Sequence, residues 1–255
     1  MSALFDLTGK TALVTGGSRG LGFAMAKALG EHGAKLVING TNKDKLQQAA
    51  SELRALAMDV EILPFDVTSE KAVQEAFLQL DQKGIHIDIL VNNAGIQFRS
   101  PLVDLSLADW DRVIQTDLTS AFLVGQQAAR RMIEKKTGGK IINIGSLLSC
   151  MGRRTIAPYA AAKGGIKLLT QTMAGEWAEH NIQANAIGPG YMLTDMNEAL
   201  INNQEFNQWV CSRTPAKRWG KPEELGGAVV FLASAASSYV NGQILYVDGG
   251  MLAVL

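Results

Sequence analysis

Two side chains that can exchange a proton stand four residues apart in the segment PYAAAKGG, residues 158–165. They are the phenol of Tyr159 and the ammonium of Lys163. On a helix this spacing places both on one face, one turn apart. A nearby cation stabilises a phenolate, and so lowers the pKa of a phenol from its ordinary value of about 10. The pair therefore suits proton transfer to a substrate oxygen, although a tyrosine beside a solvated surface lysine has the same pattern.

The elements that position this pair follow from the hydrophobic pattern. Short β-rich apolar runs are expected strands at residues 11–14, 35–39, 60–64, 89–91, 140–144, 182–187 and 244–247. Apolar residues recurring every three or four positions predict helices at residues 22–33, 43–57, 69–83, 107–136, 159–180 and 222–234. Strands apolar on both faces and separated by helices predict an α/β fold, a Rossmann-type doubly wound parallel sheet of seven strands with helices on both faces. Ligands of such sheets bind at the carboxyl ends of the strands.

Length and charge limit the class of protein. The 255 residues predict a single domain spanning 1–255. Lys plus Arg and Asp plus Glu both number 24, so no net charge attracts nucleic acid or an anionic membrane. The chain has no signal-peptide pattern, no apolar run long enough for a membrane helix and no Cys/His cluster with metal-ligand spacing. Two distant cysteines favour a reducing, cytoplasmic location over a disulfide. Together, these features predict a partner that is a small-molecule substrate, with no metal, membrane or nucleic acid.

A glycine-rich loop directly follows the first expected strand. It reads TGGSRGLG, residues 15–22, and opens a helix. Glycines in this position allow a tight turn and a close approach to a pyrophosphate, which the helix N-terminus attracts. A purely structural turn is the alternative. We expect the loop to bind a dinucleotide through Gly16, Ser18, Arg19, Gly20, Leu21 and Gly22.

The residues at the end of the second expected strand indicate whether the loop binds NAD or NADP. NAD-binding versions usually carry an acid there for the ribose 2′-hydroxyl, but this chain has Gly40. The absence of an acid removes repulsion of a 2′-phosphate, and Arg19, helped by Thr41, Asn42 or Lys43, offers it donors. We therefore predict a preference for NADP over NAD. A solvated role for Arg19 is the alternative.

Three more motifs follow later strands. Asp66 and Val67 close the third and suit the adenine. NNAG closes the fourth, where Asn93, Ala94 and Gly95 bring backbone close to the cofactor. IINIGS ends the fifth strand at Ser146, thirteen residues before Tyr159.

Together, TGGSRGLG, NNAG, Ser146, Y-x-x-x-K and PG at residues 189–190 resemble the short-chain dehydrogenase/reductase family, in its order and with its spacings, from about residue 6 to residue 250. The resemblance implies an oxidoreductase in which Tyr159 is the general acid/base. It also implies that Lys163 binds the nicotinamide ribose and that Ser146 donates a hydrogen bond to the substrate oxygen. A nucleotide-sensing protein without catalysis is the alternative of another class.

One position departs from the family pattern. The family usually has a fourth catalytic residue, an asparagine five residues before a phenylalanine, but QTDLTSAF places Asp117 there. An ionised aspartate lacks the amide donors of asparagine. We expect Asp117 to be the fourth catalytic residue. The alternative is that its carboxylate only lies at a helix bend or on the surface.

The resemblance extends to the end of the sixth strand. There GPGYMLTDM is expected to wrap the nicotinamide through Pro189, Gly190, Met192 and Thr194. The polar stretch that follows resembles the family's substrate lid, at about residues 191–218.

Within the family, NNAGIQFRSP, GRRTIAPYAAAKG, RTPAKRWG and VNGQILYVDGGML resemble gluconate 5-dehydrogenases, which interconvert D-gluconate and 5-keto-D-gluconate. The 2-deoxygluconate 3-dehydrogenase type, or another keto-sugar or ketoacyl reductase, is the alternative. A sugar acid needs cations and polar partners. Besides Ser146 and Tyr159, the expected substrate contacts are Arg99, Arg153, Arg154, Gln97 and Trp209, with solvated loops or subunit contacts as the alternative for the arginines.

The family's usual assembly implies a homotetramer through residues 107–136 and 159–180, with a second apolar interface at the terminal strand and the tail MLAVL.

Overall fold

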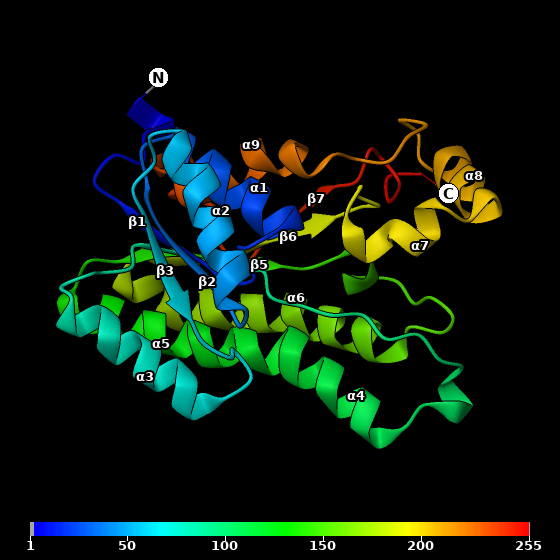
Figure 1. Cartoon of the computed structure of the whole chain (residues 1–255), viewed down its shortest axis with the longest axis horizontal. Coiled ribbons are helices and arrows are strands. Elements are labelled where there is room, and N and C mark those ends of the chain that lie inside the picture. The colour runs from blue at the N-terminus through cyan, green and yellow to red at the C-terminus, as the bar shows by residue number, and fades with distance from the viewer. Residues whose placement is uncertain (1–2, 255) are drawn as a thin grey trace.

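The computed structural model describes residues 3–254, and its centre is a seven-stranded parallel sheet (Figure 1). The strand order is β3-β2-β1-β4-β5-β6-β7. The strands are β1 Thr11–Val14, β2 Lys35–Gly40, β3 Val60–Pro64, β4 Ile89–Asn92, β5 Gly139–Ile144, β6 Ile182–Pro189 and β7 Ile244–Val247. The predicted doubly wound parallel sheet is therefore confirmed.

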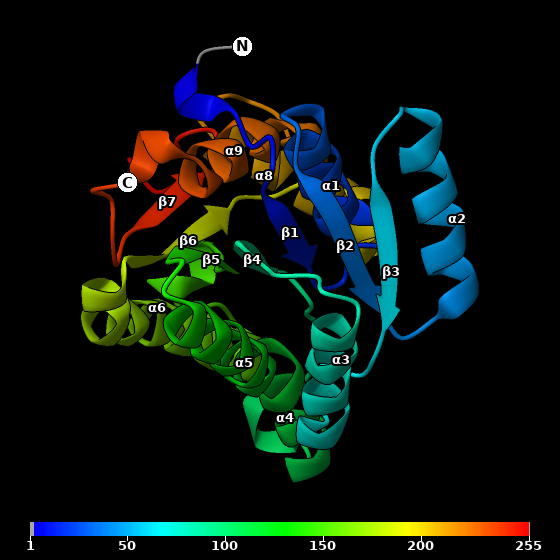
Figure 2. The same cartoon turned by 90° about the vertical axis from the view of Figure 1, so that its left-hand side faces the viewer.

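Helices cover both faces of the sheet (Figure 2). The main helices are α1 Gly20–Glu31, α2 Lys43–Ala55, α3 Glu70–Gln82, α4 Leu107–Ile114, α5 Ser120–Lys135, α6 Ala157–Trp177, α7 Glu198–Ile201, α8 Gln204–Arg213 and α9 Gly226–Ala233. Helices α1, α2 and α9 pack on one face, and α3, α5 and α6 pack on the other. No helix within residues 3–254 is both long enough and apolar enough to cross a membrane.

The strands supply apolar side chains to both layers because successive side chains point to opposite faces. In β1, Ala12 and Val14 belong to the core under α1, α2 and α9, while Leu13 belongs to the opposite core. Phe77 of α3 is fully buried in that second core. Burial on both faces explains why the strands read as continuous apolar runs.

The strand order reverses between β1 and β4. The chain adds β2 and β3 on one side of β1, then crosses to the other side of β1 and adds β4 to β7. Loops at the carboxyl ends of these two strands therefore diverge to opposite sides and leave a crevice between them. The glycine loop and NNAG are the two segments that border this crevice.

The prediction of one continuous helix over residues 107–136 is wrong. A π-helical turn, Gln115–Thr119, separates α4 from α5. A π turn holds one extra residue per turn and is frequent at functional sites. Asp117 lies within it and is buried.

Candidate functional site

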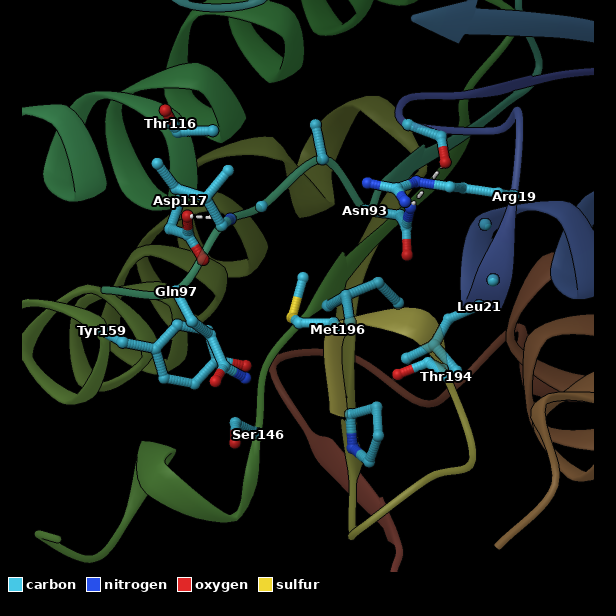
Figure 3. A pocket seen from close by; sticks show the side chains of 18 of the residues that line it. Arg19, Leu21, Asn93, Gln97, Thr116, Asp117, Ser146, Tyr159, Thr194 and Met196 are labelled. Carbon is cyan, nitrogen blue, oxygen red and sulfur yellow. Dashed lines mark hydrogen bonds between the residues drawn. The ribbon is translucent and has the colours of Figure 1, made fainter. Parts of the chain in front are cut away.

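A cavity of about 660 Å³ runs along the carboxyl edge of the sheet, from the glycine loop to Tyr159. Figure 3 shows Arg19 and Leu21 at one end of it and Ser146, Tyr159 and Gln97 at the other. The cavity thus brings together residues from the ends of β1 to β6, as expected for a doubly wound sheet.

The glycine loop can approach a ligand closely because two positions exclude side chains. Gly16 has φ +62°, and a Cβ there would lie 3.1 Å from the Cα of Ala94. A Cβ at Gly22 would collide with the carbonyl oxygen of Gly16. Hydrogen bonds hold the facing segment in place: the side chain of Asn93 donates to the carbonyl oxygen of Thr15 at 2.9 Å, and the Thr15 hydroxyl accepts from the amides of Asn93 and Ala94.

The N-terminus of α1 has free backbone donors. Its N-cap residue, Arg19, makes no capping hydrogen bond through its side chain. By contrast, Asn42, Ser69 and Ser106 cap α2, α3 and α4 with their side chains. The uncapped amides and the helix dipole suit a pyrophosphate. The loop therefore fits a dinucleotide.

At the end of β2, the lining residues are Gly40, Thr41, Asn42 and Lys45. No carboxylate follows this strand directly. Lys45, in the first turn of α2, was not expected from the sequence, but it lines the cavity beside Thr41 and Asn42. Arg19 crosses the cavity mouth and pairs with Asp195 at 3.3 Å, with both side chains exposed.

Asp66 and Val67, expected to meet the adenine, line the cavity after β3. One oxygen of Asp66 accepts from the backbone amide of Thr68 at 2.9 Å and from its hydroxyl at 2.7 Å. This turn leaves the second carboxylate oxygen of Asp66 without a bond to Thr68.

At the chemical end, Ser146, Tyr159 and Lys163 line the same cavity. Helix α6 carries Tyr159 and Lys163, and the ammonium lies 5.4 Å from the centre of the phenol ring. Lys163 is buried and donates to the carbonyl oxygen of Ile144 at 2.9 Å. The oxygen of Ser146 accepts from the amide of Leu148 at 3.2 Å, so its hydroxyl proton can be donated elsewhere.

The acidity of Tyr159 differs from the sequence expectation. Burial raises the pKa of the phenol, and the carboxylate of Asp117 acts in the same direction. Lys163, the hydrogen bond with Ser146 and the charge of Arg99 all lower the pKa, but burial outweighs them. Lys163 therefore lowers the pKa as expected, but the net shift is upward.

Asp117 lies against this group rather than on the surface. It is 2% exposed, and one oxygen accepts from the amide of Ile96 at 2.7 Å. Its other oxygen lies 3.4 Å from the ammonium of Lys163. Burial raises the pKa of the carboxyl, while Lys163 and the Ile96 amide oppose that shift.

Two arginines face the cavity without an acidic partner within residues 3–254. Arg99 donates to the side chain of Gln97 at 3.0 Å. Arg153 donates to the hydroxyl of Tyr191 at 2.9 Å, and its guanidinium lies 4.6 Å from the centre of the Phe206 ring. Burial and the nearby charge of Arg153 lower the pKa of Arg99. Two such cations suit an anionic ligand.

Two expected substrate residues lie elsewhere. Arg154 is exposed and is not part of the cavity lining, although its neighbour Arg153 is. Trp209 also lies outside the lining and packs edge-to-face against Tyr191, with ring centres 5.9 Å apart. Tyr191 was missed by the sequence reasoning. Its place directly after GPG, where the other loop residues were expected to meet the cofactor, was the available signal.

The loop after β6 closes the remaining wall. Pro189, Gly190, Met192 and Thr194 all line the cavity, and Met196 and Asn197 extend it. The side chain of Asn197 donates to the carbonyl oxygen of Met192 at 2.9 Å, which fixes the path of the loop. Helices α7 and α8 come after β6 in the chain and lie beyond the carboxyl ends of β6 and β7 (Figure 1).

Comparison with known proteins identifies the family. The model described as enoyl-(acyl carrier protein) reductase, of the short-chain alcohol dehydrogenase type, matches residues 16–252. The chain belongs to the short-chain dehydrogenase/reductase family. Membership makes it an oxidoreductase that acts on CH–OH groups.

Several family members are similar over nearly their whole length. Gluconate 5-dehydrogenase of Gluconobacter oxydans is 49% identical, over 97% of this chain and 96% of its own. 2-Dehydro-3-deoxy-D-gluconate 5-dehydrogenase of Formosa agariphila is 47% identical, over 99% of this chain and 96% of its own. The crystal structure of a gluconate 5-dehydrogenase from Burkholderia cenocepacia, in complex with NADP and tartrate, is 45% identical, covers 99% of both chains and has a TM-score of 0.96.

Proposed function

We propose that this chain is an NADP(H)-dependent oxidoreductase that interconverts D-gluconate and 5-keto-D-gluconate. Relatives named for these activities support the proposal. The observation that carries it is the pair Arg99 and Arg153, which faces the cavity of Ser146, Tyr159 and Lys163 without acidic partners in the described chain. Arg153 is partly buried, and a guanidinium binds a carboxylate through charge-assisted hydrogen bonds that can be bidentate.

The residues of this cavity have distinct proposed roles. When bound, NADPH supplies the hydride that adds to the carbonyl carbon. Tyr159 donates its proton to the carbonyl oxygen, so that a hydroxyl group forms, and takes this proton back in the oxidation direction. Ser146 donates a hydrogen bond to the same oxygen and stabilises the charge that develops there. Lys163 stabilises the phenolate that remains.

The donors at the end of β2 support NADP rather than NAD. Gly40 contributes no carboxylate that would repel a 2′-phosphate, and Arg19 and Lys45 are cations at this end of the cavity. We propose that Arg19 exchanges its exposed contact with Asp195 for the phosphate, since such exposed pairs contribute little stability.

We also propose that residues 191–218 form the lid over the substrate. Tyr191 connects this segment to the arginines, through its bond with Arg153. It also packs edge-to-face against Phe206 and Trp219, at 5.6 and 5.5 Å between ring centres. These contacts support a lid that covers the proposed carboxylate position.

A second candidate is the oxidation of 2-dehydro-3-deoxy-D-gluconate at C5. The 47% identity to a relative with that name favours it. Both substrates carry a carboxylate at one end and react at C5, so the arginine pair suits both. What separates them is the region around C2 and C3 of the sugar.

Initial rates decide between these substrates. The purified protein is assayed with NADPH and with NADH on 5-keto-D-gluconate, D-fructose and a ketoacyl thioester, and with NADP⁺ and NAD⁺ on D-gluconate and 2-dehydro-3-deoxy-D-gluconate. We expect the highest kcat/KM for the gluconate pair with NADP(H). Turnover of 2-dehydro-3-deoxy-D-gluconate without turnover of the gluconate pair contradicts the first proposal, and preference for fructose contradicts the carboxylate site.

A further inference from the structure

A carboxylate and an ammonium lie buried against each other beneath the proposed proton donor. The side chains of Asp117 and Lys163 are 0% and 5% exposed, and Oδ2 lies 3.4 Å from Nζ. The other carboxylate oxygen is engaged by the amide of Ile96. Oδ2 itself has no hydrogen-bond partner within residues 3–254. The charge of Asp117 is thus directed at Lys163.

The backbone is arranged to permit this contact. The π turn Gln115–Thr119 interrupts the α4–α5 helix where Asp117 enters the interior. Gly95 provides the room, because a Cβ there would lie 2.8 Å from Oδ2 of Asp117. Burying a carboxylate is costly unless it is paired. A position built at this cost, beside the lysine that serves Tyr159, points to an electrostatic role.

The charged groups around Tyr159 come from three segments. Lys163 of α6 and Arg99 of the segment after β4 favour the phenolate, while Asp117 of the π turn opposes it. Other charges near the cavity are engaged elsewhere: Arg112 pairs with Asp109 at 3.1 Å. Arg153 is bonded to Tyr191. Asp117 is therefore the carboxylate that balances the cations at Tyr159.

We propose that Asp117 is a positioning residue that offsets the charge of Lys163 and so sets the pH range over which Tyr159 loses its proton. The proposal rests on the acid/base role of Tyr159 in the proposed function. Asp117 acts through Lys163 and holds Ile96 through its second oxygen, without exchanging a proton with the substrate.

The sign of the effect follows from the charges. Removing the negative charge of Asp117 leaves Lys163 and Arg99 unopposed, so the phenolate becomes more favourable. Oxidation of the alcohol requires the phenolate and rises as Tyr159 loses its proton, while reduction requires the phenol and falls over the same range. Both transitions therefore move to lower pH when the charge of Asp117 is removed.

The test is Asp117→Asn, which keeps the shape and an oxygen that can accept from Ile96. Its kcat is measured against pH in both directions, beside wild type and Asp111→Asn. Asp111 is exposed on α4, six positions away, and its substitution removes the same charge outside the cavity. We expect both transitions to move to lower pH in Asp117→Asn only. Unchanged transitions, or transitions at higher pH, overturn the proposal.

A second measurement does not depend on the substrate. The near-ultraviolet absorbance of phenolate is titrated in wild type and in Tyr159→Phe, and the difference reports Tyr159 alone. The same difference is taken between Asp117→Asn and Asp117→Asn/Tyr159→Phe. A transition at lower pH in the second pair supports the proposal even if the assigned sugar acid is wrong, and coincident transitions overturn it. If Asp117→Asn does not fold, Asp117→Ser, which is also uncharged, provides the same comparison.

Discussion

Opposed influences act on the proton affinity of the Tyr159 phenol. The phenol is held inside the cavity, where burial raises the pKa, while Lys163, Ser146 and Arg99 act to lower it. A raised pKa favours the protonated phenol, which is the form that the proposed reduction requires.

Removing the hydroxyl of this residue tests its role. We expect Tyr159→Phe to lower kcat by about 10²- to 10⁴-fold, the usual contribution of a general acid. NADPH binding, measured by the fluorescence of the bound nucleotide, should remain close to that of wild type, because the ring and the glycine loop are retained. Turnover within a few-fold of wild type would contradict the assignment.

Adjacent arginines provide a matched pair for the carboxylate site. We expect Arg153→Gln to raise KM for the sugar acid by about ten- to a hundredfold, since the hydrogen bond of a charged group contributes about 1.5–3 kcal/mol. Arg154→Gln is the control, because Arg154 is exposed and outside the cavity lining. Equal effects of the two substitutions would refute a specific role of Arg153.

Among the elements, strand ends and helix starts do most to build the site. The α1 N-terminus lacks a side-chain cap where the pyrophosphate is proposed, and the π turn brings Asp117 beside Lys163. The π turn departs from the regular α-helix on either side of it. Such departures are expected at functional sites, because ligand binding and chemistry need groups that regular helices keep satisfied.

Changing the β2–α2 junction should change the choice of cofactor. At Gly40 a Cβ would lie 3.5 Å from Leu46, an ordinary contact, so a side chain fits there. We expect Gly40→Asp to reduce the NADPH/NADH ratio of kcat/KM by at least about tenfold, or 1.4 kcal/mol, because the carboxylate repels the 2′-phosphate. Gly40→Ala controls for the added carbon alone. An unchanged ratio in Gly40→Asp would show that the 2′-phosphate lies elsewhere.

The whole molecule has apolar side chains that the single chain leaves exposed. Leu107 of α4, Phe122 of α5 and Leu168 of α6 are 73, 44 and 64% exposed, and all three belong to the helices expected to contact other subunits. Exposed apolar groups of this size favour association. The tail expected at a second interface ends at residue 255, which lies outside the described residues, while Met251 within it is buried.

The homotetramer remains a prediction with a direct measurement. Light scattering coupled to size-exclusion chromatography should give about four times 27.3 kDa for the wild-type chain. We expect Leu168→Glu to give smaller species, because a charge cannot be buried at the interface without a partner. Lys167→Glu, a charge change at the neighbouring, partly exposed position, should leave the mass unchanged if the contact is specific. A wild-type mass of 27.3 kDa would contradict the expectation.

The sequence by itself determined the fold and the order of the site. Apolar runs, helical periodicity and the motifs after each strand are local patterns, and parallel strands bring their carboxyl ends to one edge. For this reason the glycine loop, Ser146, Tyr159 and Lys163 could be expected in one cavity.

Only the tertiary structure decided which side chains face that cavity and how their charges interact. Arg153 and Arg154 are adjacent residues of the same type, so the sequence does not distinguish them. In the structure only Arg153 is hydrogen-bonded to Tyr191, while Arg154 is exposed. Asp117 could not be distinguished from a surface carboxylate until the π turn placed it beside Lys163. The direction of a side chain in a loop or an irregular turn, and the desolvation of its charge, depend on packing against residues that are distant in the chain.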